Sequence, residues 1–279
     1  MRFAKMQGLG NDFIMIQGEW DDPRYGALAV SLCDRFTGIG ADGIIVYGLG
    51  READLYMRIY NSDGSEAKMC GNATRCLGKL AYESGLVKKE IITVDTQGGR
   101  KVLELRVEDG VVYSVRVNMG VPILECARIP ALCDAPRFVD MPYTASGMEV
   151  RGTLVNMGNP HSVVFLEDIA ALDLGAIGPG FERHPMFPDR INTEFVQVEP
   201  DGSLTMRVYE RGAGETMACG TGACAVMVAA RLLQKVGNTA RIHLTKGDLL
   251  LSWAGEGEPV YMEGPAAWVY DGILREESR

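Results

Sequence analysis

The sequence predicts an α+β protein built from two similar domains, and three observations lead to this fold class. One long pattern occurs twice within the 279 residues. Alternating segments typical of β-strands outnumber the helical segments in both copies. Each copy also contains one apolar helical segment that directly follows a Gly-rich loop and a cysteine. Together these features indicate a duplicated domain with a mixed set of strands and helices.

The repeat begins at residues 55–83 and returns at a constant offset of 149. At this offset Cys70 is matched by Cys219, and Glu66 is matched by Glu215. Solenoid repeats have periods of a few tens of residues, so a repeat this long indicates a duplicated domain. Two matched cysteines in two matched domains predict one site with a thiol on each side.

The chain is long enough for two domains of common size, each with its own core. Residues 119–148 contain four prolines and are expected to form the crossing between the halves. We therefore expect an N-terminal domain at residues 1–118 and a C-terminal domain at residues 119–264. The apolar segment within the tail, residues 265–279, is expected to pack back on the first domain.

In the first half, strands are separated by turns rich in glycine. Strands are predicted at residues 2–6, 12–17, 43–48, 53–60, 91–95, 100–108 and 111–118. Helices are predicted at residues 24–36 and 70–84, and Gly85 is a plausible C-cap of the second. The loop at residues 7–11 needs unusual backbone angles, and Asp109-Gly110 predicts a hairpin turn.

The second half repeats this order of elements. Strands are predicted at residues 149–156, 162–166, 193–198, 204–209, 241–245, 248–253 and 259–262. A short helix is expected near residues 167–174, and the stretch 178–190, rich in Pro and Gly, is expected to be a long loop. The helix at residues 219–236 is apolar nearly all round, so we expect it to be buried at the centre of its domain.

Composition excludes several classes of partner. The net charge is −9 and there is no run of Lys or Arg, which argues against nucleic acid and anionic membranes. The N-terminus lacks the apolar core of a signal peptide, and no apolar stretch is long enough to span a bilayer. Seven cysteines without a secretion signal favour a reducing cytoplasm. We expect a cytoplasmic protein that acts on a small molecule.

Neither a metal nor a cofactor is expected. The sequence contains no pair of cysteines separated by two residues, and its three histidines are scattered, so zinc is not predicted. No cofactor-binding motif is visible. Five cysteines have the pattern of small buried apolar residues, and these are Cys33, Cys76, Cys126, Cys133 and Cys224.

Cys70 and Cys219 are different, because each stands at the start of a predicted helix. Unpaired N–H groups and the helix dipole favour an anion there, which lowers a thiol pKa from roughly 8.5 toward neutrality. The same N–H groups can bind a carboxylate. A thiolate could remove the proton α to that carboxylate while the opposite thiol protonates the other face. This chemistry inverts the carbon and requires no cofactor.

The motifs around these cysteines resemble those of the diaminopimelate epimerases. The resemblance is carried by residues 6–13 (MQGLGNDF), 38–43 (GIGADG), 60–64 (YNSDG), 69–76 (MCGNATRC), 158–161 (GNPH), 210–216 (ERGAGET) and 218–222 (ACGTG). These motifs occur in the family's order, and the similarity extends to residues 264–266 near the C-terminal end. That is more specific than any single motif.

The resemblance implies a cofactor-independent enzyme that interconverts LL- and meso-2,6-diaminopimelate in lysine and peptidoglycan precursor biosynthesis. It implies that each domain is a mostly antiparallel sheet, curled like a barrel around a central helix, with the active site in the interdomain cleft. Carried over by position, Cys70 and Cys219 are the catalytic acid/base pair. The substrate-binding residues would be Asn11, Asn61, Gly71, Asn72, Asn159, Asn192, Glu210, Arg211, Gly220 and Thr221. A homodimer is a family-level expectation.

The residues also leave alternatives open. A proline-racemase-like or phenazine-biosynthesis-like isomerase on the same fold is the nearest rival; the thiol pair disfavours the second, and Arg211 favours a dicarboxylate-like substrate over proline. The thiols could instead form a redox switch, or the protein could be an amino-acid-binding module. His161 could take a proton from a cysteine or be a structural residue. Gly43 departs from some family members, which have glutamine there.

Overall fold

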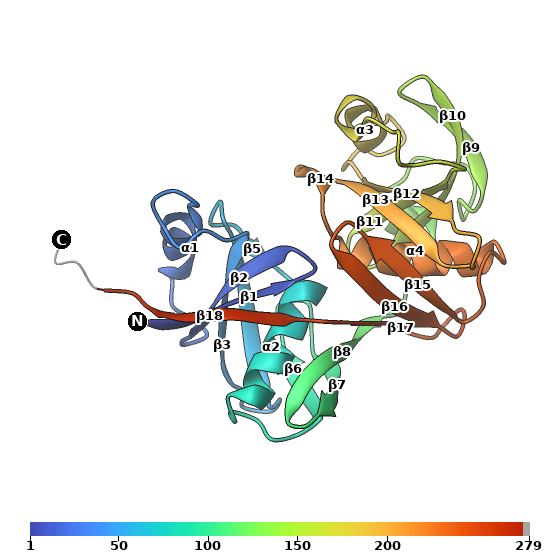
Figure 1. Ribbon diagram of the computed structural model, residues 1–279. Helices are drawn as coiled ribbons and strands as arrows, with labels where there is room; N and C mark the ends of the chain where they lie inside the picture. Colours follow the sequence, from blue (N-terminus) through green and yellow to red (C-terminus); the bar gives the residue numbers. More distant parts are fainter. Residues whose placement is uncertain (276–279) are drawn as a thin grey trace. The chain divides into compact units, whose positions relative to one another are not determined.

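The computed structural model describes residues 1–275, and the chain divides into two compact units. Unit 1 contains residues 1–118 and the C-terminal segment from residue 263, and unit 2 contains Met119–Met262. The two boundaries fall within strands β8 (Val111–Gly120) and β17 (Val260–Gly264). Each unit therefore has a core of its own (Figure 1).

Unit 1 is a mixed sheet with two helices. Its other strands are β1 (Arg2–Gly8), β2 (Asn11–Gln17), β3 (Gly43–Leu49), β4 (Leu55–Asn61), β5 (Glu66–Ala67), β6 (Ile91–Asp95), β7 (Lys101–Glu108) and β18 (Ala267–Ile273). Paired strands follow the order β18–β1–β2–β3–β4–β6–β7–β8. Only β2–β3 and β4–β6 among these pairs are parallel, so the sheet is mostly antiparallel, as predicted.

The sheet of unit 1 curls around α2 (Gly71–Glu83). This helix packs against β1, β2, β7 and β18, which are strands from both sides of the sheet. Residues 71–81 are buried, including the small residues Ala73, Gly78 and Ala81, which let the strands approach the helix closely. Gly85 follows the helix with φ of +76°, as expected of a C-cap. The other helix, α1 (Tyr25–Cys33), packs on β3 and β4.

Unit 2 repeats this arrangement. Its other strands are β9 (Met141–Ala145), β10 (Met148–Asn156), β11 (Pro160–Phe165), β12 (Asn192–Val198), β13 (Leu204–Glu210), β14 (Gly214–Thr216), β15 (Thr239–Leu244) and β16 (Gly247–Trp253). The order β9–β10–β11–β12–β13–β15–β16 again has two parallel pairs, β11–β12 and β13–β15. The central helix α4 (Gly220–Leu232) packs against β10, β11, β12, β15 and β16.

The constant offset of the repeat reappears in the element bounds. Helix α2 becomes α4, strand β3 becomes β12, and α1 becomes α3 (Leu174–Glu182), each shifted by the same 149 residues. The prediction that α4 is a buried central helix is confirmed, because residues 222–230 are all buried. The tail is also placed as predicted as far as Ile273, since β18 pairs antiparallel with β1 (Figure 1). The last four predicted tail residues, 276–279, lie outside the described residues.

Four predictions in the second half are wrong. The short helix expected near residues 167–174 is absent from the described structure there, and α3 instead occupies part of the predicted loop 178–190. Asp173 starts α3 by accepting a hydrogen bond from Ala176 N at 3.1 Å. The predicted helix at residues 219–236 ends four residues early, because Gln234 adopts a left-handed φ of +56°. Strand β9 was hidden in the Pro-rich crossing.

Candidate functional site

Both candidate cysteines stand immediately before the central helix of their unit. Cys70 is the N-cap of α2 and Cys219 is the N-cap of α4, each in an extended backbone conformation. Because the first N–H groups of a helix have no partner within it, both sulfurs lie beside a set of donors. The sequence predicted these positions, and the structure confirms them.

On the Cys70 side, the thiol belongs to a chain of side-chain amides. Cys70 Sγ lies 3.6 Å from Asn11 Oδ1, with the thiol as donor. Asn72 Nδ2 donates to the same oxygen at 3.2 Å. Arg75, whose side chain is fully buried, donates from Nη2 to Asn72 Oδ1 at 2.9 Å. The acceptor that faces the sulfur is therefore the carbonyl oxygen of Asn11.

A cluster of charged side chains lies behind Asn11. Asn11 Nδ2 donates to Asp42 Oδ2 at 2.7 Å, and Arg35 Nη2 donates to Asp42 Oδ1 at 2.7 Å. Arg35 also donates to Asp12 Oδ1 at 2.8 Å, and Lys5 Nζ lies 2.6 Å from Asp12 Oδ2. Burial would raise the pKa of Asp12, but hydrogen bonds from Arg35 and Lys5 outweigh it and lower that pKa below its usual value.

The environment of Cys219 is different. Cys219 is only 5% exposed, and its Sγ accepts a hydrogen bond from Gly222 N at 3.3 Å and lies 3.5 Å from Thr221 Oγ1. Burial, followed by the nearby carboxylates of Glu210 and Glu194, raises the pKa of Cys219 well above its usual value. The predicted lowering of the pKa is thus wrong for Cys219, because desolvation and like charge outweigh the helix N-terminus.

His161 and Glu194 form a buried pair beside Cys219. His161 Nδ1 lies 2.7 Å from Glu194 Oε1, and Nε2 lies 3.0 Å from Asn159 Oδ1. Glu194 Oε2 has no hydrogen-bond partner within residues 1–275. Ligand atoms of His161, Glu194 and Cys219 lie within 4.8 Å of one another, a donor set that could hold a metal ion.

Three more of the predicted residues lie at the start of β12 or around the end of β13, and these are Asn192, Glu210 and Arg211. Asn192 Oδ1 accepts a hydrogen bond from Arg211 N at 2.9 Å. The exposed Arg211 side chain donates from Nη1 to Asp189 O at 3.2 Å. Glu210 accepts from Thr216, and burial raises the pKa of Glu210 although hydrogen bonds from Thr216 and Cys219 lower it. Of the predicted residues in unit 2, Glu210 and Thr221 thus contact the Cys219 thiol, Gly220 follows it in α4, and Asn159 reaches it through the ring of His161.

Comparisons with known proteins agree with this arrangement of residues. The sequence profile described as diaminopimelate epimerase matches residues 3–125 and 153–269. A diaminopimelate epimerase of Phocaeicola vulgatus is 49% identical over 277 residues, which is 98% of this chain and 98% of that protein. One from Pelotomaculum thermopropionicum is 49% identical over 275 residues, again 98% of each. This chain belongs to the diaminopimelate epimerase family.

A solved structure supports the fold independently. A probable proline racemase from Agrobacterium radiobacter superposes with a TM-score of 0.74 at 16% identity, covering 99% of this chain and 93% of that one. At this identity the likeness concerns the fold alone. The predicted fold class, two α+β domains with curled sheets around a central helix, is confirmed.

The surroundings of Gly43 explain why a glycine stands at this position. Gly43 pairs with Asn61 across β3 and β4. A Cβ atom at Gly43 would lie 2.6 Å from the carbonyl oxygen of Tyr60, so no larger side chain fits this backbone. Asn61 itself is exposed and donates from Nδ2 to Ser65 Oγ at 3.0 Å.

Several site residues were missed in the sequence. Asp42 and Arg75 belong to the hydrogen-bonded side chains beside Cys70, and the carboxylate of Glu194 acts by its charge on Cys219. Glu182 fixes the turn after β13 by accepting a hydrogen bond from Gly212 N at 2.9 Å. One signal was available: Glu194 is a charged residue directly before Phe195 and Val196 in a predicted strand. Arg75 gives a similar signal on the buried helix α2.

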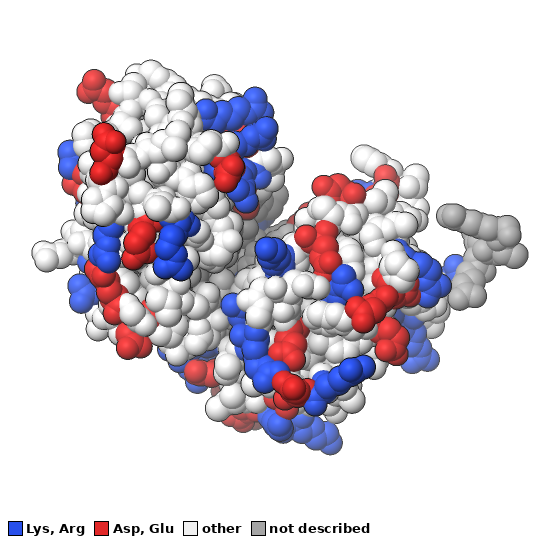
Figure 2. All heavy atoms as spheres, turned by 180° about the vertical axis from the view of Figure 1, so that it is seen from behind, with Lys and Arg blue, Asp and Glu red and all other residues white. Residues whose placement is uncertain are grey.

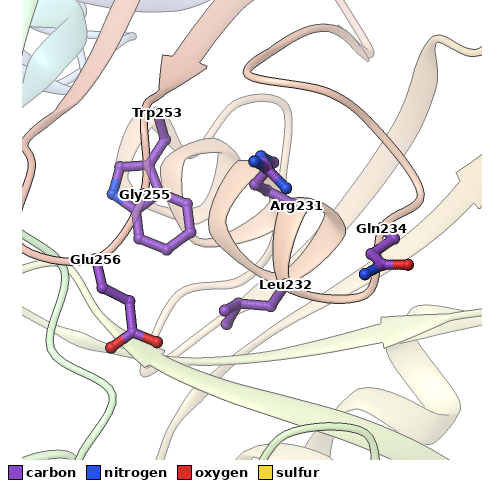
Figure 3. Close-up of a pocket in the computed structure, with 6 residues that line it drawn as sticks. All are labelled: Arg231, Leu232, Gln234, Trp253, Gly255 and Glu256. Atoms are coloured by element: carbon purple, nitrogen blue, oxygen red, sulfur yellow. The ribbon is translucent and has the colours of Figure 1, made fainter.

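Features outside the site are of ordinary kinds. Burial raises the pKa of Cys33 to about 11 and that of Cys76 to about 12, as expected of structural thiols. A separate pocket at the C-terminal end of α4 is lined by Arg231, Leu232, Gln234, Trp253, Gly255 and Glu256 (Figure 3). Acidic and basic side chains are interspersed over the face shown in Figure 2. No helix within residues 1–275 has both the length and the apolarity to cross a membrane.

Proposed function

We propose that this protein interconverts LL-2,6-diaminopimelate and meso-2,6-diaminopimelate by moving one α-proton between two cysteines. The observation that carries the proposal is the pair Cys70 and Cys219, placed at equivalent helix N-termini of two similar units. Membership of the diaminopimelate epimerase family and the names of the similar proteins support the substrate. The product would serve lysine and peptidoglycan precursor synthesis.

In the proposed reaction, the thiolate of one cysteine removes the α-proton, forming an S–H bond as the C–H bond breaks. The electron pair stays on the α-carbon and is delocalised into the carboxylate. The thiol of the other cysteine then donates its proton to the opposite face, so the carbon is inverted and that sulfur becomes the thiolate. Because the pKa of Cys219 is raised, we assign Cys219 as the proton donor and Cys70 as the base in the first half of this cycle.

The helix N-termini supply the electrostatic stabilisation. N–H groups of Gly71 and Asn72 in α2, and of Gly220 and Thr221 in α4, would hold the reacting carboxylate. Charge that develops on this carboxylate in the transition state is then met by preorganised donors. The positive α-ammonium group of the substrate, close to the Cys70 sulfur, would favour the thiolate, whose proton leaves to solvent.

The remaining polar residues suit the rest of the substrate. Arg211 is exposed and can bind a distal carboxylate with two parallel hydrogen bonds. Glu210 and the four asparagines can accept hydrogen bonds from the substrate ammonium groups or fix the orientation of the substrate. These asparagines are Asn11, Asn61, Asn159 and Asn192.

The experiment that tests the proposal is proton NMR of LL-diaminopimelate with the reduced protein in D2O. Loss of the α-proton signal together with meso product is expected. If folded, reduced protein gives no exchange with this substrate, the proposal is wrong. Proline and hydroxyproline are the next substrates to try, because the proline racemase shares the fold.

The cell compartment and the assembly follow from the same proposal. A reaction that needs one thiol and one thiolate requires reduced cysteines, which fits the cytoplasm. Oxidation should therefore stop turnover, and dithiothreitol should restore it. A homodimer is proposed on the family resemblance, and sedimentation velocity would test it.

A further inference from the structure

The chain of side chains beside Cys70 has a fixed direction, because its two ends differ in chemistry. Arg75 can only donate hydrogen bonds, so the atom of Asn72 that faces Arg75 must be the oxygen. An ionised Asp42 can only accept, so the atom of Asn11 that faces Asp42 must be the NH2 nitrogen. Both ends thus require the same orientation of the intervening amides.

This orientation decides what the sulfur of Cys70 meets. With its NH2 group held by Asp42, Asn11 turns its carbonyl oxygen toward Cys70 Sγ at 3.6 Å and toward Asn72 Nδ2 at 3.2 Å. A carbonyl oxygen accepts the proton of a thiol but repels the charge of a thiolate. If the Asn11 amide were reversed, its NH2 group would stabilise the thiolate instead.

We propose that Asp42 is a positioning residue, which holds the Asn11 carbonyl oxygen against Cys70 and thereby makes the Cys70 thiolate a stronger base. The proposal rests on the proposed epimerase function. The α-proton of an amino acid is only weakly acidic, so a thiolate that is stabilised too well removes it slowly. A neighbouring acceptor favours the protonated thiol over the thiolate and so makes the thiolate a stronger base.

The charged cluster suits Asp42 for this role. Arg35 holds the other oxygen of Asp42 at 2.7 Å, and Asp12 N donates to Asp42 Oδ2 at 3.1 Å. The carboxylate is therefore fixed at both oxygens before it meets Asn11. The equivalent position in unit 2, Ile191, is apolar, so this orienting device belongs to the Cys70 side alone.

The decisive variant is Asp42→Asn, which keeps the shape of the side chain but can present either an oxygen or an NH2 group. Because 40% of the Asp42 side chain is exposed, we expect the variant to fold. Reversal of the Asn11 amide then becomes possible, and the fraction of Cys70 present as thiolate should rise. A tenfold larger fraction of a thiolate with lower intrinsic nucleophilicity gives about threefold faster alkylation.

Two readouts are needed. Iodoacetamide labelling at neutral pH, resolved by peptide mass spectrometry, should show faster alkylation of Cys70, while Cys219 in the same sample serves as an internal control. Turnover of diaminopimelate should show kcat reduced about tenfold with a smaller change in KM, since a weaker base slows proton abstraction while the reversed Asn11 amide alters at most one binding contact. A purely structural defect would alter both cysteines.

Two further variants make the comparison sharp. Asp95→Asn also removes a carboxylate partner of an arginine, Arg100, in the same unit but outside the amide chain, and should leave both cysteines as in the wild type. Arg35→Ala loosens Asp42 without replacing it and should change Cys70 in the same direction by less. Arg35 is 56% exposed, so this variant is also expected to fold.

Unchanged alkylation of Cys70 in folded Asp42→Asn and Arg35→Ala would overturn the proposal. Equal acceleration of Cys70 and Cys219 would also overturn it, because that result means general loosening. Labelling does not require turnover, so it tests Asp42 even if wild-type protein fails to exchange the α-proton of diaminopimelate. Conversely, if the wild type exchanges the α-proton normally while alkylation of Cys70 is unchanged in Asp42→Asn, that result would refute only the role of Asp42.

Discussion

The two units use the same scaffold, but their cysteines lie in different chemical environments. In unit 1, Arg58 Nε bonds Glu66 Oε1 at 2.7 Å, and in unit 2 Arg207 Nη2 lies 2.7 Å from Glu215 Oε1. These matched pairs brace the strand before each cysteine. The scaffold around the two thiols is therefore inherited as a unit, down to individual ion pairs.

The polar groups around the sulfurs do not follow the repeat. Asn11 uses its NH2 group to bind Asp42 and presents its oxygen to Cys70. Asn159, its counterpart in the Gly-Asn motif of unit 2, lies with its oxygen against the His161 ring. Cys219 accepts from a backbone N–H and is buried near two carboxylates. Duplication thus supplied two similar frames, and substitutions around them made the two thiols unequal.

Removing either sulfur should have the largest effect. Cys70→Ala and Cys219→Ala should each reduce epimerisation by about 10²–10⁴-fold, the range typical of a lost general acid or base. NMR in D2O with each pure stereoisomer measures exchange and inversion separately. Near-normal turnover by either folded variant would contradict the two-base mechanism.

A substitution at Gly222 should have the next largest effect on turnover, and it distinguishes the surroundings of Cys219 from those of Cys70. Its counterpart at the repeat offset is Ala73, so unit 1 already has a methyl group there. In unit 2 a Cβ atom would lie 2.5 Å from Glu194 Oε1 and 3.2 Å from Cys219 Sγ. Gly222→Ala should therefore displace the sulfur and lower kcat by about 10–100-fold, as expected for a misplaced catalytic group.

A second substitution checks the cause of that loss. Adding Glu194→Ala to Gly222→Ala removes the atom that the new methyl group meets, and should restore part of kcat. Glu194→Ala alone provides the reference for this double-mutant comparison. If the double variant is no better than Gly222→Ala, contact with Glu194 is not the reason for the loss.

The matched arginines test the scaffold instead of the chemistry. Arg207 donates to Ile169 O at 2.7 Å and Leu172 O at 2.8 Å in addition to its ion pair. Arg58 donates to the equivalent carbonyl, Trp20 O. Each arginine replaced by Met should lower the free energy of unfolding by about 1–3 kcal/mol, because hydrogen bonds of a charged group are lost.

The loss should be larger for Arg207→Met, since Arg207 serves three carbonyl groups where Arg58 serves one. Urea unfolding of both variants, at constant protein concentration, measures the difference. Equal losses would mean that the ion pair with glutamate, and not the carbonyl contacts, sets the stability of each frame.

The repeat explains how much of this molecule could be predicted from its sequence. Cys70, Cys219 and the central helices follow from a pattern of residue types along the chain, which the offset of 149 makes visible twice. Helix α3 was missed because three glycines and a proline obscure its helical pattern. Its counterpart α1 at the same offset could have revealed it.

The electrostatics of the site could not be predicted in the same way. Whether Asn11 offers oxygen or NH2 to the sulfur depends on Asp42, thirty-one residues away in the sequence. The raised pKa of Cys219 depends on burial of the thiol and then on Glu210 and Glu194, which reach it from two strands. Helix-end rules treat both cysteines alike, so the difference between them emerges only from neighbours that the fold brings together.

The smallest expected effect is on stability at low pH, and this effect should also differ between unit 1 and unit 2. The pKa of Asp12 is lowered in the folded protein, so its carboxylate stabilises unit 1 above the unfolded value of 3.8, and this contribution is lost as the pH falls through the folded pKa. The pKa of Glu210 is raised, so protonation of Glu210 in acid favours the folded state of unit 2. Acid should therefore weaken the Cys70 side first.

The Asp12→Asn variant tests the stabilisation that the charged Asp12 carboxylate provides. The variant should have a lower urea midpoint than the wild type at pH 7, because Arg35 and Lys5 then lose the negative charge with which they pair. As the pH falls below 3.8, the wild-type carboxylate becomes protonated and the two midpoints should converge. Midpoints that stay equally far apart down to pH 2 would show that Asp12 acts through its shape, and that the charged cluster does not distinguish unit 1 from unit 2 in acid.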